Sequence, residues 1–444
     1  MDLEVWLNGE VIAVVGEKRG KMSMTYTNRA RPLGAPLISM AMPVGSQKYG
    51  DKKVRAFFRG LLPEGQARRI LAYDFGVAES DDMGLLAALG KDCAGALVLQ
   101  PKVAAPPLMA GEAKARRISD AEIGRRLREL PIHPLGVDGR TRVSLAGVQS
   151  KLLLTQCEDG TWELPVNGAP STHILKPAHR ELPESVVNEA FCLALAERAG
   201  VRAARTSVSV FGDIETLVSE RFDRVRIAGN VERLHQEDAC QALSVLTLVP
   251  EQKYEGFGGP SLAKIAELLD LWGGAKSKEE LLRQVAFHVI VGNADAHGKN
   301  FSFLHNNDRT VRLAPAYDVM STSYYSIAHG RQMSSELGLF VNQKRDIDEV
   351  TVEDLLAEAE CWGVRREHGK AVLNELLERL PEALSHVIAQ VPNTPQALVE
   401  LVRMRAQRAR EEAAILSLGR TSTSLSLSEQ DERKTDGLHL RPSL

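Results

Sequence analysis

The stretch "GNADAHGKNFSFL", residues 292–304, decides how the rest of the chain is interpreted. It places an Asp, a His, a Lys and an Asn in the six positions from Asp295 to Asn300, and the following residues are mainly apolar. An Asp and an Asn often do no more than cap or turn a loop between a helix and a strand. The alternative is a chemistry that needs a carboxylate and an amide five residues apart.

Phosphoryl transfer from ATP is a reaction that uses this spacing. Protein kinases have an Asp that faces the acceptor hydroxyl, an Asn five residues later, and a second Asp that holds Mg²⁺ together with the Asn. The second Asp is present as Asp318 in "LAPAYDVMS", after a predicted strand-turn-strand unit. Because amide and carboxylate oxygens suit Mg²⁺, we assign Asn300 and Asp318 to the metal and Asp295 to the hydroxyl proton. His297 and Lys299 would then lie near the phosphates.

Three upstream segments occur in the order found in protein kinases. The turn "SLAGVQSK", Ser144 to Lys151, which we call the phosphate loop, is rich in small residues whose backbone amides suit an anion-binding concavity. Lys176 ends the apolar strand "HILK", and Glu189 on the next predicted helix is its ion-pair candidate. "SERFDR", residues 219–224, lies where a nucleotide-binding hinge is expected, so backbone groups of Glu220 to Phe222 would face the adenine edge.

Each upstream segment also has an ordinary structural explanation. The turn needs no ligand, Lys176 and Glu189 are residue types that usually lie solvated at the surface, and "SERFDR" is a charged strand end. The order favours phosphoryl transfer more than any one motif does, because six elements occur along one chain in the kinase sequence.

The composition excludes several classes of protein. Hydrophobic residues make up 44% of the 444 residues, charged residues 25%, and the formal net charge is −3, so the chain lacks the basic excess of a general nucleic-acid binder. The five cysteines are scattered and never spaced as CxxC, which argues against a disulfide framework and a structural zinc site and favours a reducing cytoplasm. The first residues show no signal-peptide pattern, and no segment is apolar enough to span a membrane.

Strand patterns precede helix patterns along the chain. A hairpin is predicted at Asn8-Gly9, a linker rich in Pro and Ala over 101–115, and helices dominate from 236 onward. We therefore predict an α+β, protein-kinase-like fold of two lobes, with an extra N-terminal subdomain and an all-helical C-terminal lobe. The predicted units are a β-rich N-terminal subdomain (1–110), an N-lobe with phosphate loop, strand lysine and hinge (111–235), a helical C-lobe with the catalytic loop (236–416), and a disordered tail rich in Ser and Thr (417–444).

Eight motifs together resemble the HipA family of bacterial toxin kinases, within the wider group of protein-kinase-like and lipid-kinase-like enzymes. They are "FFRGLLPEG", "GKDCAGAL", "RVSLAGVQSK", "THILKP", "SERFDR", "QEDACQAL", "GNADAHGKNF" and "AYDVMS". The resemblance covers residues 1 to 415 and implies an ATP- and Mg²⁺-dependent serine/threonine kinase. It matches Asp295 to the proton acceptor and Asn300 and Asp318 to the metal ligands. It also matches Ser144 to an autophosphorylation site, where modification in trans expels the loop and switches the kinase off.

The resemblance further implies the nucleotide contacts and the partners. In the family the substrate is an aminoacyl-tRNA synthetase, glutamyl-tRNA synthetase being the best-known target, and phosphorylation stops charging and slows growth. The family also implies a small helix-turn-helix antitoxin, HipB-like, that carries the kinase to operator DNA. The residues matched to ATP-binding positions are Ala146, Gly147, Val148, Gln149, Ser150, Lys151, Lys176, Glu220, Arg221, Phe222, His297, Gly298, Lys299, Asn300, Tyr317 and Asp318.

Two features depart from the family pattern. Ser150 replaces an acidic residue often found before the loop lysine, and the tail after 416 matches nothing in the family. The first departure changes the electrostatics of the phosphate loop. A phosphate on Ser144 would still add about two negative charges beside those of ATP, so expulsion of the loop is expected on electrostatic grounds.

Three other interpretations remain open. A small-molecule kinase on the same fold would have a pocket closed over the acceptor site, whereas a kinase for a folded protein needs an open face there. A metal-dependent phosphohydrolase would use His288, Asp295, His297 and Asp318 as ligands, and would leave the Asn and the strand lysine without a role. A non-catalytic module that only sequesters a DNA-binding partner would not need the base, the metal ligands and the lysine, all of which are present.

Overall fold

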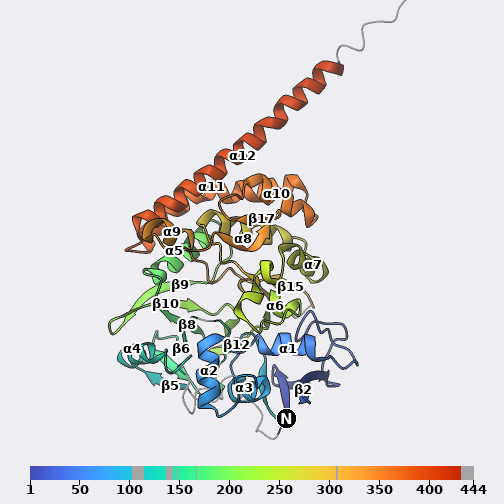
Figure 1. The fold of residues 1–444 in the computed structure, drawn as a ribbon, viewed down its shortest axis with the longest axis vertical. Helices are drawn as coiled ribbons and strands as arrows, with labels where there is room; N and C mark the ends of the chain where they lie inside the picture. The colour runs from blue at the N-terminus through green and yellow to red at the C-terminus, as the bar shows by residue number, and fades with distance from the viewer. Residues whose placement is uncertain (103–114, 137–143, 148, 167, 307–308, 432–444) are drawn as a thin grey trace, which may run out of the picture.

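The computed structural model describes residues 1–102, 115–136, 144–147, 149–166, 168–306 and 309–431. The β-rich half of the chain lies below the helical half in Figure 1, and the C-terminal helix α12 (Gln396–Asp431) crosses the top and projects from the body. This arrangement is the predicted α+β fold of two lobes with an additional N-terminal subdomain. No helix in these described ranges is long and apolar enough to cross a membrane.

A four-stranded antiparallel sheet and three helices form the N-terminal subdomain. Asn8 and Gly9 join the first two strands with φ of 51° and 80°, the positive dihedrals that a two-residue turn requires, so the predicted hairpin is confirmed. Phe57 and Phe58 are fully buried in the core of this subdomain. The strand order is β3-β2-β1-β4, with β1 at Asp2–Leu7, β2 at Glu10–Lys18, β3 at Lys21–Tyr26 and β4 at Val98–Pro101, and the helices are α1 (Asp51–Arg59), α2 (Gly65–Asp74) and α3 (Asp82–Leu89).

A six-stranded antiparallel sheet forms the next layer, in the order β5-β7-β6-β8-β10-β9. On it, Lys176 of β8 lies opposite Leu217 of β10. Helix α5 packs against β9 and β10 on one side and against α11 on the other, so it connects the sheet to the helical lobe. The elements are β5 (Ala115–Ile118), β6 (Leu152–Gln156), β7 (Trp162–Pro165), β8 (His173–Pro177), β9 (Thr206–Phe211), β10 (Ile214–Glu220), α4 (Asp120–Glu129) and α5 (Ser185–Arg198).

The helical lobe contains the largest hydrophobic core, which α5 shares with α8, α10, α11 and α12. Its helices are α6 (Ala239–Ala242), α7 (Leu262–Trp272), α8 (Ser277–Val291), α9 (Ser323–His329), α10 (Val352–Cys361), α11 (Arg366–Gln390) and α12, with the 3-10 turns η1 (Pro250–Lys253), η2 (Glu255–Phe257) and η3 (Gly298–Asn300).

The lobe also contains short strands, so the prediction of an all-helical lobe needs correction. They pair as β13-β14-β15 and β16-β17, and a separate hairpin, β11-β12, comes just before the lobe in the sequence. The pair β14 and β15 is the strand-turn-strand unit predicted before Asp318. β13 and β17 have three residues each, too few for an alternating pattern to be recognised. The strands are β11 (Arg224–Ile227), β12 (Asn230–Arg233), β13 (Gln236–Asp238), β14 (Ser302–His305), β15 (Val311–Leu313), β16 (Glu336–Val341) and β17 (Lys344–Asp346).

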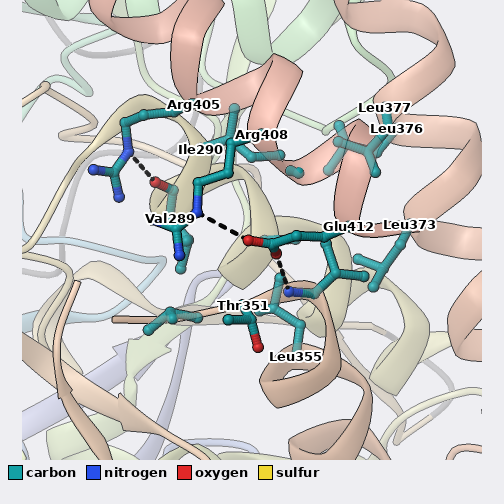
Figure 2. Close-up of a pocket in the computed structure, with 14 residues that line it drawn as sticks. Val289, Ile290, Thr351, Leu355, Leu373, Leu376, Leu377, Arg405, Arg408 and Glu412 are labelled. Carbon is teal, nitrogen blue, oxygen red and sulfur yellow. Dashed lines mark hydrogen bonds and ion pairs between the residues drawn. The ribbon is translucent and has the colours of Figure 1, made fainter. Parts of the chain in front are cut away.

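Helix α12 docks on the lobe through its N-terminal half. Figure 2 shows Arg405 donating to the carbonyl oxygen of Val289 at 3.0 Å, and Glu412 accepting a hydrogen bond from Arg408 at 2.9 Å. Glu412 also accepts the N–H of Val352 at 2.9 Å. These contacts border an apolar cavity of about 40 Å³, which is too small for a nucleotide.

The tail predicted to be disordered from 417 is instead helical as far as Asp431. Only the first turn of a helix is costly to form, and further residues add to it readily. The docked half of α12 supplies that first turn, so a Ser- and Thr-rich composition does not prevent the helix from continuing. Most of the predicted linker (103–114) and the last residues (432–444) lie outside the described residues.

Candidate active site

A cavity of about 350 Å³ lies between the N-terminal subdomain, the six-stranded sheet and the helical lobe. Its volume falls in the range of about 300–1,000 Å³ that is usual for small-molecule sites. Most of the predicted site residues meet here. Those that line the cavity are Ala146, Gly147, Gln149, Lys151, Lys176, Glu189, Glu220, Arg221, Phe222, Asp295, His297, Lys299, Asn300, Tyr317 and Asp318.

A few of the predicted residues do not line the cavity. Ser144 is fully buried, and Ser150 is exposed and borders a different, smaller cavity. Gly298 is buried, and a Cβ atom there would lie 2.5 Å from Pro260. Val148 lies outside the described residues. Ser150 and Gly298 therefore shape the two loops rather than face the cavity.

The segment between α8 and β14, residues 292–301, which we call the catalytic segment, places Asp295 and Asn300 at the cavity. Helix α8 ends at Gly292, whose φ of 71° is the left-handed conformation in which helices commonly end. Asn300 Oδ1 accepts the N–H of His297 at 3.1 Å, and Asn300 Nδ2 lies 3.3 Å from Asp318 Oδ2. Asn300 thus caps the turn and also faces the second Asp, so the capping and metal-site explanations are compatible.

Lys176 connects the sheet, helix α5 and the loop that carries Asp318. Its Nζ lies 2.7 Å from Glu189 Oε1 and 2.8 Å from Asp318 Oδ1. Burial by itself lowers the pKa of Lys176, but the two carboxylates outweigh it and raise the pKa above its usual value. Lys176 in turn lowers the pKa of Asp318, so this carboxylate stays ionised. The predicted strand lysine, helix glutamate and second Asp therefore form one charged cluster.

The backbone of Asp318 has an uncommon conformation. Its φ of 57° lies in the left-handed region, which few residues other than glycine adopt. Such conformations cost energy and cluster at functional sites. The carboxylate remains 49% exposed, so it is accessible from the cavity.

Hydrogen bonds hold the phosphate loop at both ends. Lys151 Nζ donates to the carbonyl oxygen of Ala146 at 2.7 Å, and Ser144 Oγ donates to the carbonyl oxygen of Leu61 at 2.6 Å. Gly147 has a φ of 111°, and a Cβ atom there would lie 2.6 Å from Lys151 Nζ, so this position requires glycine. Burial lowers the pKa of Lys151 to about 8. The loop therefore brings a lysine amine to the same cavity as Lys176.

The hinge differs from the prediction in one respect. The buried Arg221 side chain donates two hydrogen bonds to Asp223, at 2.9 and 2.8 Å, so it is not free to contact a nucleotide. The N–H of Arg221 is also engaged, with the carbonyl oxygen of Thr172 at 2.9 Å. Phe222 faces Tyr317 with ring centroids 5.3 Å apart and planes tilted by 37°. This aromatic pair, rather than Arg221, offers a surface for an adenine ring.

Some residues at the site are not identified by the sequence patterns. Tyr254 Oη donates to Asp295 Oδ1 at 2.6 Å, and Glu64 from the N-terminal subdomain forms an ion pair with Lys299. Asp238 also lines the cavity, where burial raises its pKa to about 6. No spacing rule links these residues to the catalytic segment. Glu64 and Asp238 lie in the quoted motifs "FFRGLLPEG" and "QEDACQAL", and Tyr254 lies in none of the quoted motifs.

The donor set fits Mg²⁺ and ATP rather than a hydrolase metal centre. Within the described ranges of the chain, no group of three or more His, Cys, Asp or Glu side chains could hold a metal ion. His288 is buried, and its Nδ1 already has a partner in Asn293 Nδ2 at 3.0 Å. Asn300 and Asp318 instead offer an amide and a carboxylate, the oxygen donors that hold Mg²⁺ jointly with phosphates.

Protein-family profiles match two long parts of the chain. Residues 3–100 match the HipA N-terminal domain, and residues 143–384 match the HipA-like C-terminal domain. The second match contains the phosphate loop, the strand lysine, the hinge and the catalytic segment. The match therefore includes the whole cluster around Lys176.

Full-length relatives give the same result. Y4mE, a candidate kinase of Sinorhizobium fredii, is 35% identical over 396 residues, which are 87% of this chain and 91% of Y4mE. The serine/threonine-protein kinase toxin HipA of Shewanella oneidensis is 30% identical over 382 residues, 83% of this chain and 84% of HipA. A solved Shewanella oneidensis complex of HipA, HipB and operator DNA has a TM-score of 0.76 at 27% identity, covering 93% of this chain and 96% of the matched chain. With the fold, the site and these matches in agreement, the chain belongs to the HipA family.

Proposed function

We propose that this chain is an ATP- and Mg²⁺-dependent serine/threonine protein kinase. The observation that carries the proposal is the cluster in which Lys176 bridges Glu189 and Asp318, next to Asn300 and the exposed Asp295. A Lys–Glu ion pair, an Asp and an Asn for the metal, and an Asp for the acceptor are the parts with which protein kinases transfer a phosphoryl group. A hydrolase or a pure binding module would need no such arrangement.

Each side chain would have a distinct task. Lys176 would hold the inner phosphates of ATP, and the aromatic pair at the hinge would pack against adenine. Asn300 and Asp318 would hold Mg²⁺, which neutralises charge on the phosphates when bound. Asp295 would accept the hydrogen bond of the acceptor hydroxyl and take its proton. The hydroxyl oxygen then bonds to the γ-phosphorus while the bond from that phosphorus to the departing ADP breaks.

The proposed acceptor is a folded protein. Asp295 is exposed at the cavity, so a hydroxyl on the surface of another protein reaches it without entering a closed pocket. The Shewanella oneidensis relative is named as a serine/threonine-protein kinase toxin. The family resemblance points to an aminoacyl-tRNA synthetase, with glutamyl-tRNA synthetase as the first candidate. Its phosphorylation would inhibit translation and growth in the bacterial cytoplasm.

Ser144 is the proposed autophosphorylation site. Its side chain is fully buried and donates to the carbonyl oxygen of Leu61. A phosphate, with about two negative charges, suits neither the burial nor the contact with a carbonyl oxygen. A modified loop would therefore leave its place and take Lys151 out of the cavity, which would switch the kinase off.

A small HipB-like antitoxin is the proposed partner. The solved relative was determined with HipB and operator DNA, and its fold matches nearly the whole of this chain. This chain has a formal net charge of −3. Because DNA affinity depends largely on positive charge, we assign the operator contacts mainly to the antitoxin.

The test is phosphate transfer from radiolabelled ATP to purified synthetases in the presence of Mg²⁺. Asp295→Asn is the matched control, because it removes the base and preserves the shape of the side chain. We expect one labelled synthetase with the wild type and none with the variant, and phosphoproteomics after brief induction would identify the acceptor residue. Label on metabolites alone would favour a small-molecule kinase, and growth arrest by Asp295→Asn would favour a non-catalytic module.

A further inference from the structure

Tyr254 makes a direct contact with the proposed base. Its Oη donates to Asp295 Oδ1 at 2.6 Å. Among the described residues, no other side chain forms a hydrogen bond with this carboxylate. Asp295 Oδ2 is therefore available to an acceptor hydroxyl.

The ring of Tyr254 is held from several sides. It packs edge-on against His297, with centroids 5.2 Å apart and planes at 83°, and Lys253 Nζ lies 5.3 Å from the ring centroid. The N–H of Tyr254 donates to the carbonyl oxygen of Glu251 at 3.0 Å, and its own carbonyl oxygen accepts the N–H of Gly259 at 2.9 Å. The hydroxyl is thus placed by its surroundings and not by the contact with Asp295 alone.

The segment that carries Tyr254 is anchored to the helical lobe. Tyr254 lies between η1 and η2, and Glu255 accepts the N–H of Phe340 in β16 at 2.7 Å. A Cβ atom on Gly259 would lie 2.6 Å from the carbonyl oxygen of Tyr254, so the close turn requires glycine. These contacts hold the donor in position before any acceptor arrives, which is how supporting residues orient a catalytic group.

We propose that Tyr254 is a positioning residue, whose hydroxyl fixes one oxygen of Asp295 and directs the other toward the acceptor hydroxyl. The inference rests on the proposed kinase function. During transfer the acceptor proton moves to Asp295 Oδ2, and Tyr254 keeps its own proton. A base that is already fixed in one orientation loses less freedom when the acceptor binds, so more of the reaction occurs from the productive geometry.

The same hydrogen bond sets the basicity of Asp295. The protein around the cavity separates Asp295 from bulk water and so raises its pKa, although its side chain remains accessible from the cavity. The Tyr254 hydroxyl and the charge of Lys253 lower the pKa, and the charge of Asp318 raises it. These are the titratable and charged groups that face the carboxylate. Removing the hydroxyl removes one lowering influence, so the pKa of Asp295 should rise. Because the base must be ionised, the acid limb of kcat/KM should move to higher pH.

The first experiment compares the wild type with Tyr254→Phe, which preserves the ring. Tyr73→Phe is the matched control, because Tyr73 lies on α2 and is 86% exposed. Release of inorganic phosphate from MgATP, with water as the acceptor, is measured over a range of pH. We expect Tyr254→Phe to lower kcat about tenfold, to leave KM for ATP unchanged, and to move the acid limb upward. Tyr73→Phe should alter none of these.

The second experiment does not depend on turnover. The NMR signal of the Asp295 carboxyl carbon, assigned by its absence in Asp295→Asn, is titrated in the wild type and in Tyr254→Phe. A higher pKa in Tyr254→Phe supports the inference, and an unchanged pKa or an unchanged kcat overturns it. If the wild type neither hydrolyses ATP nor transfers phosphate, the kinase proposal fails. The titration is a separate test, because an equal pKa of Asp295 in the wild type and in Tyr254→Phe overturns the role of Tyr254 whether or not the protein is a kinase.

Discussion

The Oγ of Ser144 lies 2.6 Å from the carbonyl oxygen of Leu61, so the phosphate loop is hydrogen-bonded to the N-terminal subdomain. The N–H of Ser144 also donates to the carbonyl oxygen of Asp92 at 2.9 Å. On the other side of the cavity, Lys299 of the catalytic segment pairs with Glu64 of the same subdomain. The extra N-terminal subdomain thus holds both loops of the candidate active site.

Replacing Ser144 with Glu should weaken ATP binding by about tenfold or more, because a buried carboxylate facing a carbonyl oxygen is strongly unfavourable and the loop must leave. Ser144→Ala is the matched control. It loses one hydrogen bond, worth about 1 kcal/mol of stability, and should bind ATP normally. Titration calorimetry with MgATP measures both affinities. Equal affinities for the two variants would contradict a switch based on the burial of Ser144.

Lys176→Met should destabilise the protein and abolish its stabilisation by ATP. The Glu189 side chain is 7% exposed and would lose its cation, which costs roughly 3–5 kcal/mol for a buried pair. Adding Glu189→Gln should recover much of the free energy of unfolding, because no uncompensated carboxylate remains on α5. The double variant should still gain no stability from ATP, because Lys176 is absent. Urea unfolding with and without MgATP separates these effects, and a double variant no more stable than Lys176→Met would refute the explanation.

Sequence patterns are sufficient where residues that meet in space belong to one local unit. Lys176 and Glu189 are 13 residues apart, at the end of a strand and on the helix that follows it. Asp295 and Asn300 lie in one connection between α8 and β14. In such units the geometry of a single turn determines which side chains face each other, so spacing is informative.

Contacts between distant segments could not be predicted in this way. Glu64 meets Lys299 across 235 residues and Tyr254 meets Asp295 across 41, and polar residues on loops carry no periodicity that indicates a partner. Arg221 lies in the segment predicted as the hinge, yet its side chain points away from the cavity and pairs with Asp223 and Asp92. The position of Arg221 in its motif therefore predicted that it lies at the cavity, but not the direction of its side chain.

Glu64→Gln should destabilise the protein and increase hydrogen exchange in the catalytic segment, 292–301. The Lys299 side chain is 8% exposed, so its ammonium would lose its ion-pair partner at a buried position, at a cost of about 3 kcal/mol. Glu79→Gln, at an exposed position of the same subdomain, is the control and should leave exchange unchanged. Hydrogen exchange followed by mass spectrometry gives the comparison. If exchange rises equally in both variants, the ion pair does not hold the loop.

Asp92 should make the free energy of unfolding depend on pH in the acid range. It is fully buried among the guanidinium groups of Arg224 at 2.9 Å, Arg233 at 3.4 Å and Arg221 at 3.5 Å, and it accepts the Ser171 hydroxyl at 2.7 Å. Burial alone would raise the pKa of Asp92, but the three cations outweigh it and lower the pKa to about 2.

Because the folded pKa of Asp92 lies below the unfolded value of about 3.9, its stabilising contribution is complete above pH 4 and is lost as the pH falls toward about 2. Asp92→Asn removes this charge from among three arginines and should cost roughly 3 kcal/mol of unfolding free energy at neutral pH. The variant should also lose less stability than the wild type between pH 4 and 2. Asp213→Asn, at a side chain that is 71% exposed, is the control and should unfold at the wild-type urea midpoint throughout. If the free energy of unfolding falls equally for the wild type and Asp92→Asn between pH 4 and 2, Asp92 does not cause the acid dependence. Asp223 of the same cluster would then be the group to examine, because Arg221 and Arg224 lower its pKa as well.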